Sequence, residues 1–133
     1  MAKPLILISH GNLCIELKKS VELIMGPQEG IKTVDLQPGE GQTEFLQKFT
    51  AVTKDLADFV VFADLYGGTP CNVASKLLLS GSHFKLYAGM NMSMVIAYLN
   101  SNMLDNEPDP IKGGVQGICD VNETIQALDD EDE

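Results

Sequence analysis

Two patterns of apolar residues alternate along the chain, and together they predict short buried strands separated by amphipathic helices. Four largely apolar runs are typical of strands in a parallel sheet, where helices cover both faces. Between these runs, apolar residues recur at helical spacing and charged residues take the opposite face. The predicted strands are residues 5–8, 31–36, 59–63 and 84–88. The predicted helices are residues 13–25, 43–56, 70–80 and 92–99.

Residues that favour helix starts stand at the expected boundaries. Asn12 precedes the first predicted helix and is a good N-cap. Thr69 followed by Pro70 predicts the start of the third helix, with Thr69 as the N-cap. Asn91 and Ser93 are both candidate caps for the fourth helix.

Strand and helix alternate four times, which predicts an α/β fold with a doubly wound, mainly parallel sheet and helices on both faces. If the first strand lies centrally, the strand order is 2-1-3-4 and strands 1 and 3 are neighbours. Residues 113–125 are ambiguous, because their three glycines disfavour a helix. Their apolar residues Val115, Ile118, Val121 and Ile125 could belong to a short fifth strand, antiparallel at the sheet edge, or to a packed irregular tail.

A histidine and an aspartate each follow one of the two strands that the predicted order makes neighbours. His10 ends the first strand and Asp64 ends the third. In open α/β sheets, ligands bind at the carboxyl ends of the strands, where the strand order reverses. A carboxylate on one ring nitrogen would fix the tautomer and leave the other nitrogen free to act as a nucleophile. We therefore predict that Asp64 orients His10, although each could also be an ordinary loop residue.

The loop after Asp64 contains a candidate anion site. Gly67 and Gly68 lead into Thr69 and a predicted helix start, where free backbone N–H groups favour phosphate. The Thr69 hydroxyl is a further candidate donor. No Lys or Arg lies near His10 or this loop in the sequence, so a phosphoryl group would be held only transiently. The bland alternative is an ordinary turn before a helix.

The charge and length of the chain argue against several classes of function. The 133 residues suffice for one domain, predicted as residues 1–128, followed by an acidic tail, residues 129–133. The net charge of −10 argues against nucleic acid and against anionic membrane surfaces as partners. No apolar run approaches the roughly 18 residues that a membrane span needs, and no signal peptide is recognisable.

The cysteines and the absence of known motifs exclude several kinds of chemistry. The three cysteines are far apart and contain no CxxC, so neither a metal site nor a disulfide framework is predicted. Reduced thiols favour a cytoplasmic protein. A hydrolase is disfavoured because Ser9 is not within G-x-S-x-G. No G-x-G-x-x-G or Walker motif occurs, so no nucleotide cofactor, and no other cofactor, is predicted.

Three segments together resemble the enzyme IIA proteins of the mannose family of the bacterial phosphoenolpyruvate-dependent sugar phosphotransferase system. Residues 5–11, LILISHG, resemble the opening of that family. Residues 63–72, ADLYGGTPCN, resemble its Asp-x-x-Gly-Gly-Ser/Thr-Pro-x-Asn signature, and residues 88–94, AGMNMSM, resemble a Gly-x-Asn-x-Pro-Met motif. The order and spacing of the three also match, over roughly residues 4–100.

This resemblance implies a phosphoryl carrier. His10 would accept a phosphoryl group from the phosphocarrier HPr and pass it to a histidine on enzyme IIB, for uptake and phosphorylation of a mannose-class sugar. Asp64 would be the carboxylate partner of His10, and Thr69 would contact the phosphoryl group. Such proteins are homodimers that exchange C-terminal segments, which here would be residues 113–122. Contact with the membrane would be indirect, through the transporter complex.

The sequence departs from the family pattern at Ser93, where a proline is usual, and this change is expected to loosen the start of the fourth helix. The C-terminal region has no clear match. Two alternatives to the carrier stay open. One is the phosphotransfer subunit of a dihydroxyacetone kinase, which shares the strand followed by histidine. The other is a non-catalytic module that binds a small anion or a flavin.

Overall fold

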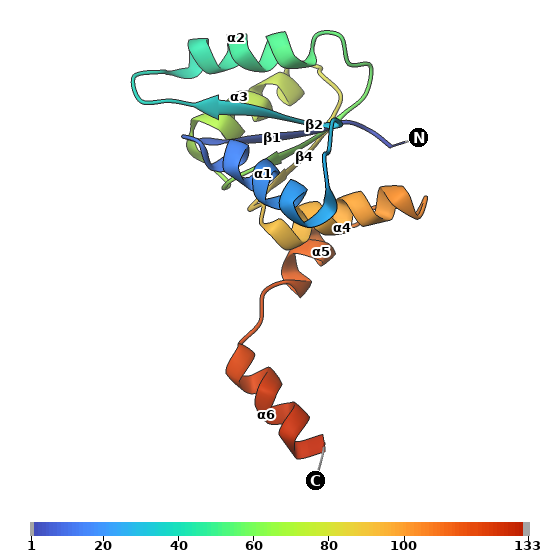
Figure 1. The fold of residues 1–133 in the computed structure, drawn as a ribbon. Helices are drawn as coiled ribbons and strands as arrows, with labels where there is room; N and C mark the ends of the chain where they lie inside the picture. The colour runs from blue at the N-terminus through green and yellow to red at the C-terminus, as the bar shows by residue number, and fades with distance from the viewer. Residues whose placement is uncertain (1, 132–133) are drawn as a thin grey trace.

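The computed structural model describes residues 2–131 and contains one four-stranded sheet (Figure 1). The strands are β1 (Leu5–His10), β2 (Ile31–Leu36), β3 (Val60–Ala63) and β4 (Lys85–Ala88). All pairs are parallel and the order is β2-β1-β3-β4. The predicted α/β fold and strand order are therefore confirmed.

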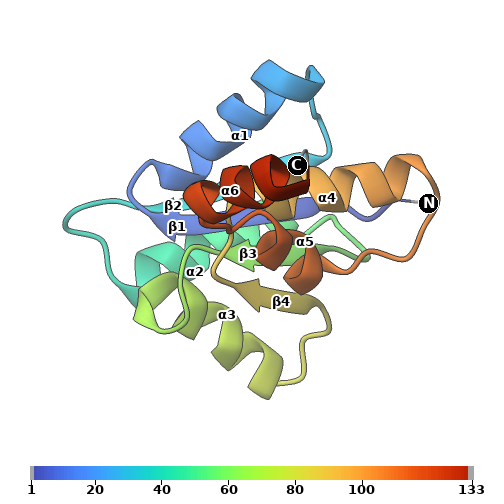
Figure 2. The ribbon, with the colours of Figure 1, turned by 90° about the horizontal axis from the view of Figure 1, so that it is seen from below.

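Helices cover both faces of the sheet (Figure 1). Helices α2 (Gln42–Thr53) and α3 (Gly68–Leu79) lie on one face, and α1 (Leu13–Met25) and α4 (Met92–Met103) lie on the other. Figure 2 looks onto the face that α1 and α4 cover. Two more helices follow, α5 (Pro110–Gln116) and α6 (Val121–Glu131).

The central strand β1 supplies residues to both cores, because successive side chains on a strand point to opposite faces. Leu5 and Leu7 belong to the core under α1 and α4, whereas Ile6 and Ile8 belong to the core under α2 and α3. All four are at most 1% exposed. The same alternation sends Ser9 toward the α1 side and His10 toward the α3 side.

The helix starts differ from the prediction in how they are capped. Helix α3 begins at Gly68 with Gly67 as its N-cap, so Thr69 lies inside the first turn and is not the cap. The Asn12 side chain, although it stands at the N-cap of α1, makes no capping hydrogen bond. Asn91 does cap α4: its Oδ1 accepts a hydrogen bond of 2.8 Å from the N–H of Met94. Of the two candidate caps, Asn91 and Ser93, it is therefore Asn91 that caps α4.

Residues 113–125, the candidate for a fifth strand, contain no strand: residues 113–116 end α5, and residues 121–125 lie in α6. Residues 110–116 form α5, which packs closely against α4 because glycines face small residues there. A Cβ on Gly113 would lie 2.5 Å from the Cβ of Ala97, and a Cβ on Gly117 would overlap the side chain of Ser93. The glycines that argue against a helix by propensity are thus required by its packing.

Helix α6 extends away from the body of the molecule (Figure 1). None of its residues is buried. The acidic residues 129–131, predicted as a solvated tail, continue this helix, and the last two residues of that tail lie outside the described residues. Among residues 2–131, no helix is long and apolar enough to cross a membrane.

We expect Gly113→Ala to destabilise the fold. Alanine gains up to about 1 kcal/mol of helix propensity over glycine, but overpacking against Ala97 costs about 1–3 kcal/mol, so the net effect is a loss. Urea unfolding followed by circular dichroism measures it. Gly30→Ala is the matched control, because nothing lies within 4 Å of a Cβ there. A Gly113→Ala protein as stable as wild type would contradict the close α4–α5 packing.

Candidate functional site

The structure brings His10 and Asp64 together at the carboxyl ends of the two central strands. Ile8 on β1 is in register with Ala63 on β3, so the residues that follow them leave the sheet side by side. The Nδ1 atom of His10 lies 2.8 Å from Oδ2 of Asp64. The backbone N–H of His10 donates to the same oxygen at 3.0 Å. The predicted pairing of carboxylate and imidazole is therefore present.

Asp64 is fixed more firmly than the histidine that it holds. Its Oδ1 accepts a hydrogen bond of 3.0 Å from the N–H of Leu65, so both carboxylate oxygens are occupied. The side chain of Asp64 is 7% exposed and that of His10 is 45% exposed. Because an ionised carboxylate only accepts hydrogen bonds, Nδ1 of His10 must be the donor. In the neutral ring, Nε2 therefore carries the lone pair.

Gly68 lies directly against the histidine ring. A Cβ at this position would stand 2.7 Å from Cε1 and 3.0 Å from Nε2 of His10. Gly68 also has a φ of 76° and Gly67 a φ of 85°, conformations that other residues rarely adopt. Both glycines are thus needed to bring the start of α3 beside Nε2.

The start of α3 offers backbone N–H groups at this place. No side chain caps the helix. Pro70 has no N–H, so the free donors that the first turn offers are the amides of Gly68 and Thr69, at the positive end of the helix dipole. Thr69 is half-buried in this turn. Four of the predicted site residues, Asp64, Gly67, Gly68 and Thr69, thus lie at or just before the start of α3. One of them, Gly68, lies against the ring of His10.

Sequence reasoning missed the contacts that hold the loop after His10. The Nε2 atom of Gln37 donates to Oδ1 of Asn12 at 2.8 Å and to Oδ2 of Asp35 at 2.7 Å. Lys48 bridges Asp35 and Glu40, at 3.3 and 2.9 Å. The hydrogen bond from Gln37, together with Lys48, lowers the pKa of Asp35 below its usual value. These residues come from β2, from α2 and from the loops after β1 and β2, so no local pattern in the sequence predicts their contacts.

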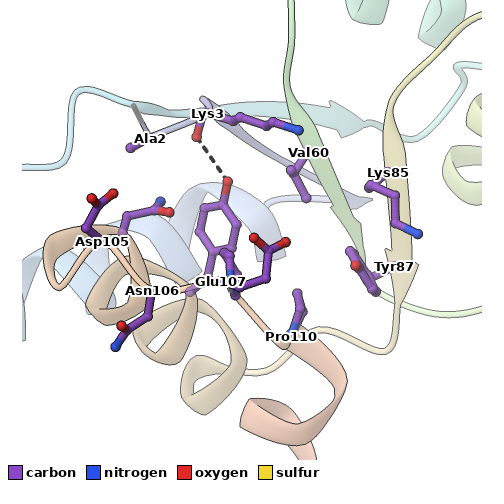
Figure 3. A pocket seen from close by; sticks show the side chains of 12 residues that line it. Ala2, Lys3, Val60, Lys85, Tyr87, Asp105, Asn106, Glu107 and Pro110 are labelled. Carbon is purple, nitrogen blue, oxygen red and sulfur yellow. Dashed lines mark hydrogen bonds between the residues drawn. The ribbon is translucent and has the colours of Figure 1, made fainter.

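The site is open to solvent and is distinct from a cavity of about 540 Å³ (Figure 3). Lys3, Val60 and Lys85 line that cavity, and they stand at the amino ends of the strands, at the sheet edge opposite His10. Across residues 2–131, no three His, Cys, Asp or Glu side chains are grouped as metal ligands. The chemistry available at His10 is therefore that of an exposed imidazole, a buried carboxylate and backbone amides.

Comparison with known protein families identifies the family in which this arrangement of residues occurs. Residues 4–109 match the EIIA-man family, described as PTS system fructose IIA component. The chain belongs to this family. The match includes the strands, the His10–Asp64 pair and the glycine loop, and it ends before α5.

Relatives of this chain are found among both known proteins and solved structures. The chain is 30% identical over 111 residues to the PTS system mannose-specific EIIAB component of Escherichia coli K12, covering 81% of this chain but 34% of that protein. It is 28% identical to the PTS system fructose-specific EIIA component of Bacillus subtilis, covering 71% and 67%. The phosphotransferase system component EIIA of Streptococcus agalactiae has a TM-score of 0.80 at 30% identity, covering 92% and 99%. The chain thus spans about a third of the first relative.

Other reactive side chains of this IIA component do not take part in the site. Cys14 and Cys71 are buried in the two cores. Burial raises the pKa of the Cys14 thiol, which keeps it protonated and unreactive. His83 is exposed in the loop before β4.

We expect Asp64→Asn to disturb the tautomer of His10 without unfolding the protein. Asparagine has one acceptor oxygen, so it cannot accept from both His10 and the Leu65 amide. Nitrogen-15 NMR of the imidazoles measures the result: a dominant Nδ1–H form in wild type and a mixture in the variant. The exposed His83 serves as an internal control. Identical His10 spectra for the two proteins would rule out the orienting role of Asp64.

Proposed function

We propose that this IIA component is a phosphohistidine carrier, in which Nε2 of His10 accepts a phosphoryl group from HPr and passes it to enzyme IIB. The observation that supports this most is the Asp64 contact, which occupies Nδ1 and leaves Nε2 as the free nucleophilic nitrogen. Family membership supports the reaction class. A mannose-class sugar and a cytoplasmic location are proposals that rest on the family resemblance and on the name of the Escherichia coli relative.

The transfer requires one bond to form and one to break. The Nε2 lone pair attacks phosphorus while the bond between phosphorus and the donor breaks and its electron pair returns to the donor. The histidine ring then carries positive charge, which the carboxylate of Asp64 stabilises through Nδ1–H. Reversing these steps toward an acceptor histidine returns His10 to its neutral form. No proton has to move at Nδ1 during either step.

The phosphoryl oxygens need donors, and the start of α3 supplies them. Gly67 and Gly68 allow the backbone to approach the ring, and the amides of Gly68 and Thr69, with the Thr69 hydroxyl, would bind the oxygens. The chain contains no arginine, and Lys48, the lysine of the neighbouring network, is bound to Asp35 and Glu40. A phosphoryl group held by neutral donors alone is bound weakly enough to be passed on.

Exposed apolar residues surround this site and suit a protein partner. Leu13 is 53% exposed, Leu65 is 49% exposed and Tyr66 is 89% exposed. They follow the same two strand ends as His10 and Asp64, so a partner that reaches His10 also covers them. An open site ringed by apolar side chains fits transfer between proteins, in which the partners' surfaces exclude water.

We expect one phosphoryl group on His10. Intact-protein mass spectrometry at alkaline pH, after incubation with phosphoenolpyruvate, enzyme I and HPr, should show an acid-labile adduct of one phosphoryl group. His10→Ala should show none. His83→Ala, which removes the only other histidine, should be phosphorylated like wild type.

The structure offers a second variant for the same experiment. Gly68→Ala should reduce the phosphorylation rate at least tenfold, because its Cβ would press on the ring beside Nε2. An adduct that persists in His10→Ala would contradict the proposal. The absence of any adduct on wild type, when the same donors phosphorylate a known enzyme IIA, would also contradict it. That result would favour the alternatives, a dihydroxyacetone kinase subunit or a binding module.

We further propose that the protein is a homodimer joined through its C-terminal helices. An isolated helix as short as α6 is marginal in water, so its stability requires packing. The apolar residues Val121, Ile125 and Leu128 share one face of α6, and each is more than half exposed. A second copy that covers this face would supply the missing packing. The family resemblance implies a homodimer as well, although with residues 113–122 as the exchanged segment.

We expect Ile125→Asp to shift the protein from dimer to monomer. A carboxylate in the middle of the apolar face cannot be buried without a partner. Light scattering coupled to size exclusion, over a range of concentrations, measures the mass. Gln126→Asp, at the adjacent position, introduces the same charge off this face and should leave the dimer intact. A wild-type mass of one chain at all concentrations would refute the dimer.

A further inference from the structure

Ser9 is an unusual residue in this core. It is completely buried, at 0% exposure, and among the described residues no other Ser, Thr, Asn, Gln, His or charged residue is buried. A buried hydroxyl is costly unless hydrogen bonds compensate for the lost water. Its neighbour His10 is the residue on which the proposed function depends, and β-strand alternation sends the two side chains to opposite faces.

The Ser9 hydroxyl joins both ends of the turn that carries His10. Its Oγ donates to the carbonyl oxygen of Gly11 at 3.2 Å. The same Oγ accepts a hydrogen bond of 2.8 Å from the N–H of Cys14, in the first turn of α1. Ser9 therefore does from the preceding strand what the Asn12 side chain does not do at the N-cap.

No other group is placed to replace this contact. Cys14 is completely buried, so water cannot reach its N–H if the hydroxyl is removed. The Asn12 side chain is bound to Gln37. Without the hydroxyl, the turn keeps the hydrogen bond from the N–H of Gly11 to the carbonyl oxygen of Leu36, at 2.7 Å, and the bond from the N–H of Glu16 to the carbonyl oxygen of Asn12, at 3.0 Å. The N–H of His10 also keeps its bond to Asp64. None of these bonds satisfies the N–H of Cys14 or ties the first turn of α1 to Ser9 on β1.

We propose that Ser9 is a positioning residue for the phosphoryl transfer, holding the His10 turn so that the imidazole stays on Asp64 with Nε2 toward the start of α3. This inference rests on the proposed function. Ser9 is too deeply buried to touch a phosphoryl group, so it acts only through His10. Its loss would let the turn move relative to α1, and small displacements of a reacting group reduce rates strongly.

The test compares Ser9→Ala with wild type by single-turnover phosphorylation from phospho-HPr, per folded molecule and below the melting temperature of every variant. The maximal rate should fall roughly tenfold, while the donor concentration for half-maximal rate stays the same, because the docking surface is unchanged. Ser9→Thr, which keeps the hydroxyl, should recover most of the rate. Thr53→Val, which removes a hydroxyl bound to the carbonyl of Phe49 far from the site, should not alter it.

A second readout is independent of phosphoryl transfer. Nitrogen-15 NMR of His10 should show mixed tautomers in Ser9→Ala and a dominant Nδ1–H form in wild type and Ser9→Thr. If Ser9→Ala lowers only the melting temperature and leaves the phosphorylation rate and the His10 tautomer unchanged, the role of Ser9 is purely structural and the inference is overturned. If wild type accepts no phosphoryl group, the proposed function fails, and the His10 spectra still decide whether Ser9 positions the ring.

Discussion

The hydrogen bond between His10 and Asp64 is the interaction on which the geometry of the site depends. It requires β1 and β3 to be neighbours, which in turn requires the crossover order β2-β1-β3-β4. It also requires both strands to end at the same level, which the register of Ile8 with Ala63 provides. The carboxylate keeps its position because its two oxygens bind the backbone of both loops as well as the ring. The buried core thus presents a single, oriented nitrogen at the surface.

Around this contact, the two flanking loops contribute in different ways. The loop after β3 brings backbone close to the ring through two glycines whose conformations other residues rarely adopt. The loop after β1 is held by side chains, Ser9 from within the core and Gln37 from the neighbouring strand's end. Short, well-anchored loops on a rigid scaffold suit the proposed carrier function, because transfer in both directions would depend on the placement of one atom.

The two C-terminal helices differ in how they pack against the rest of the protein. Helix α5 belongs to the body of the protein, since glycines allow it to lie closely on α4. Helix α6 leaves that body and exposes its apolar face (Figure 1). The family match stops before both helices, at residue 109. The proposed phosphoryl-transfer site and the surface proposed for dimer formation therefore occupy separate parts of the chain.

The sequence alone determined the α/β class, the strand order and the pairing of His10 with Asp64, because apolar runs and helical periodicity are local signals and parallel strands end at a common edge. Helix capping and the C-terminal region needed the tertiary structure. Propensity favours Thr69 as a cap and leaves residues 113–125 ambiguous, but in the structure Gly67 is the cap and Gly113 packs against Ala97 within a helix. The roles of Ser9 and Gln37 were equally hidden, because their partners come from other elements. Local pattern thus fixes which elements form, whereas the close approach of distant residues fixes their ends and the geometry of the site.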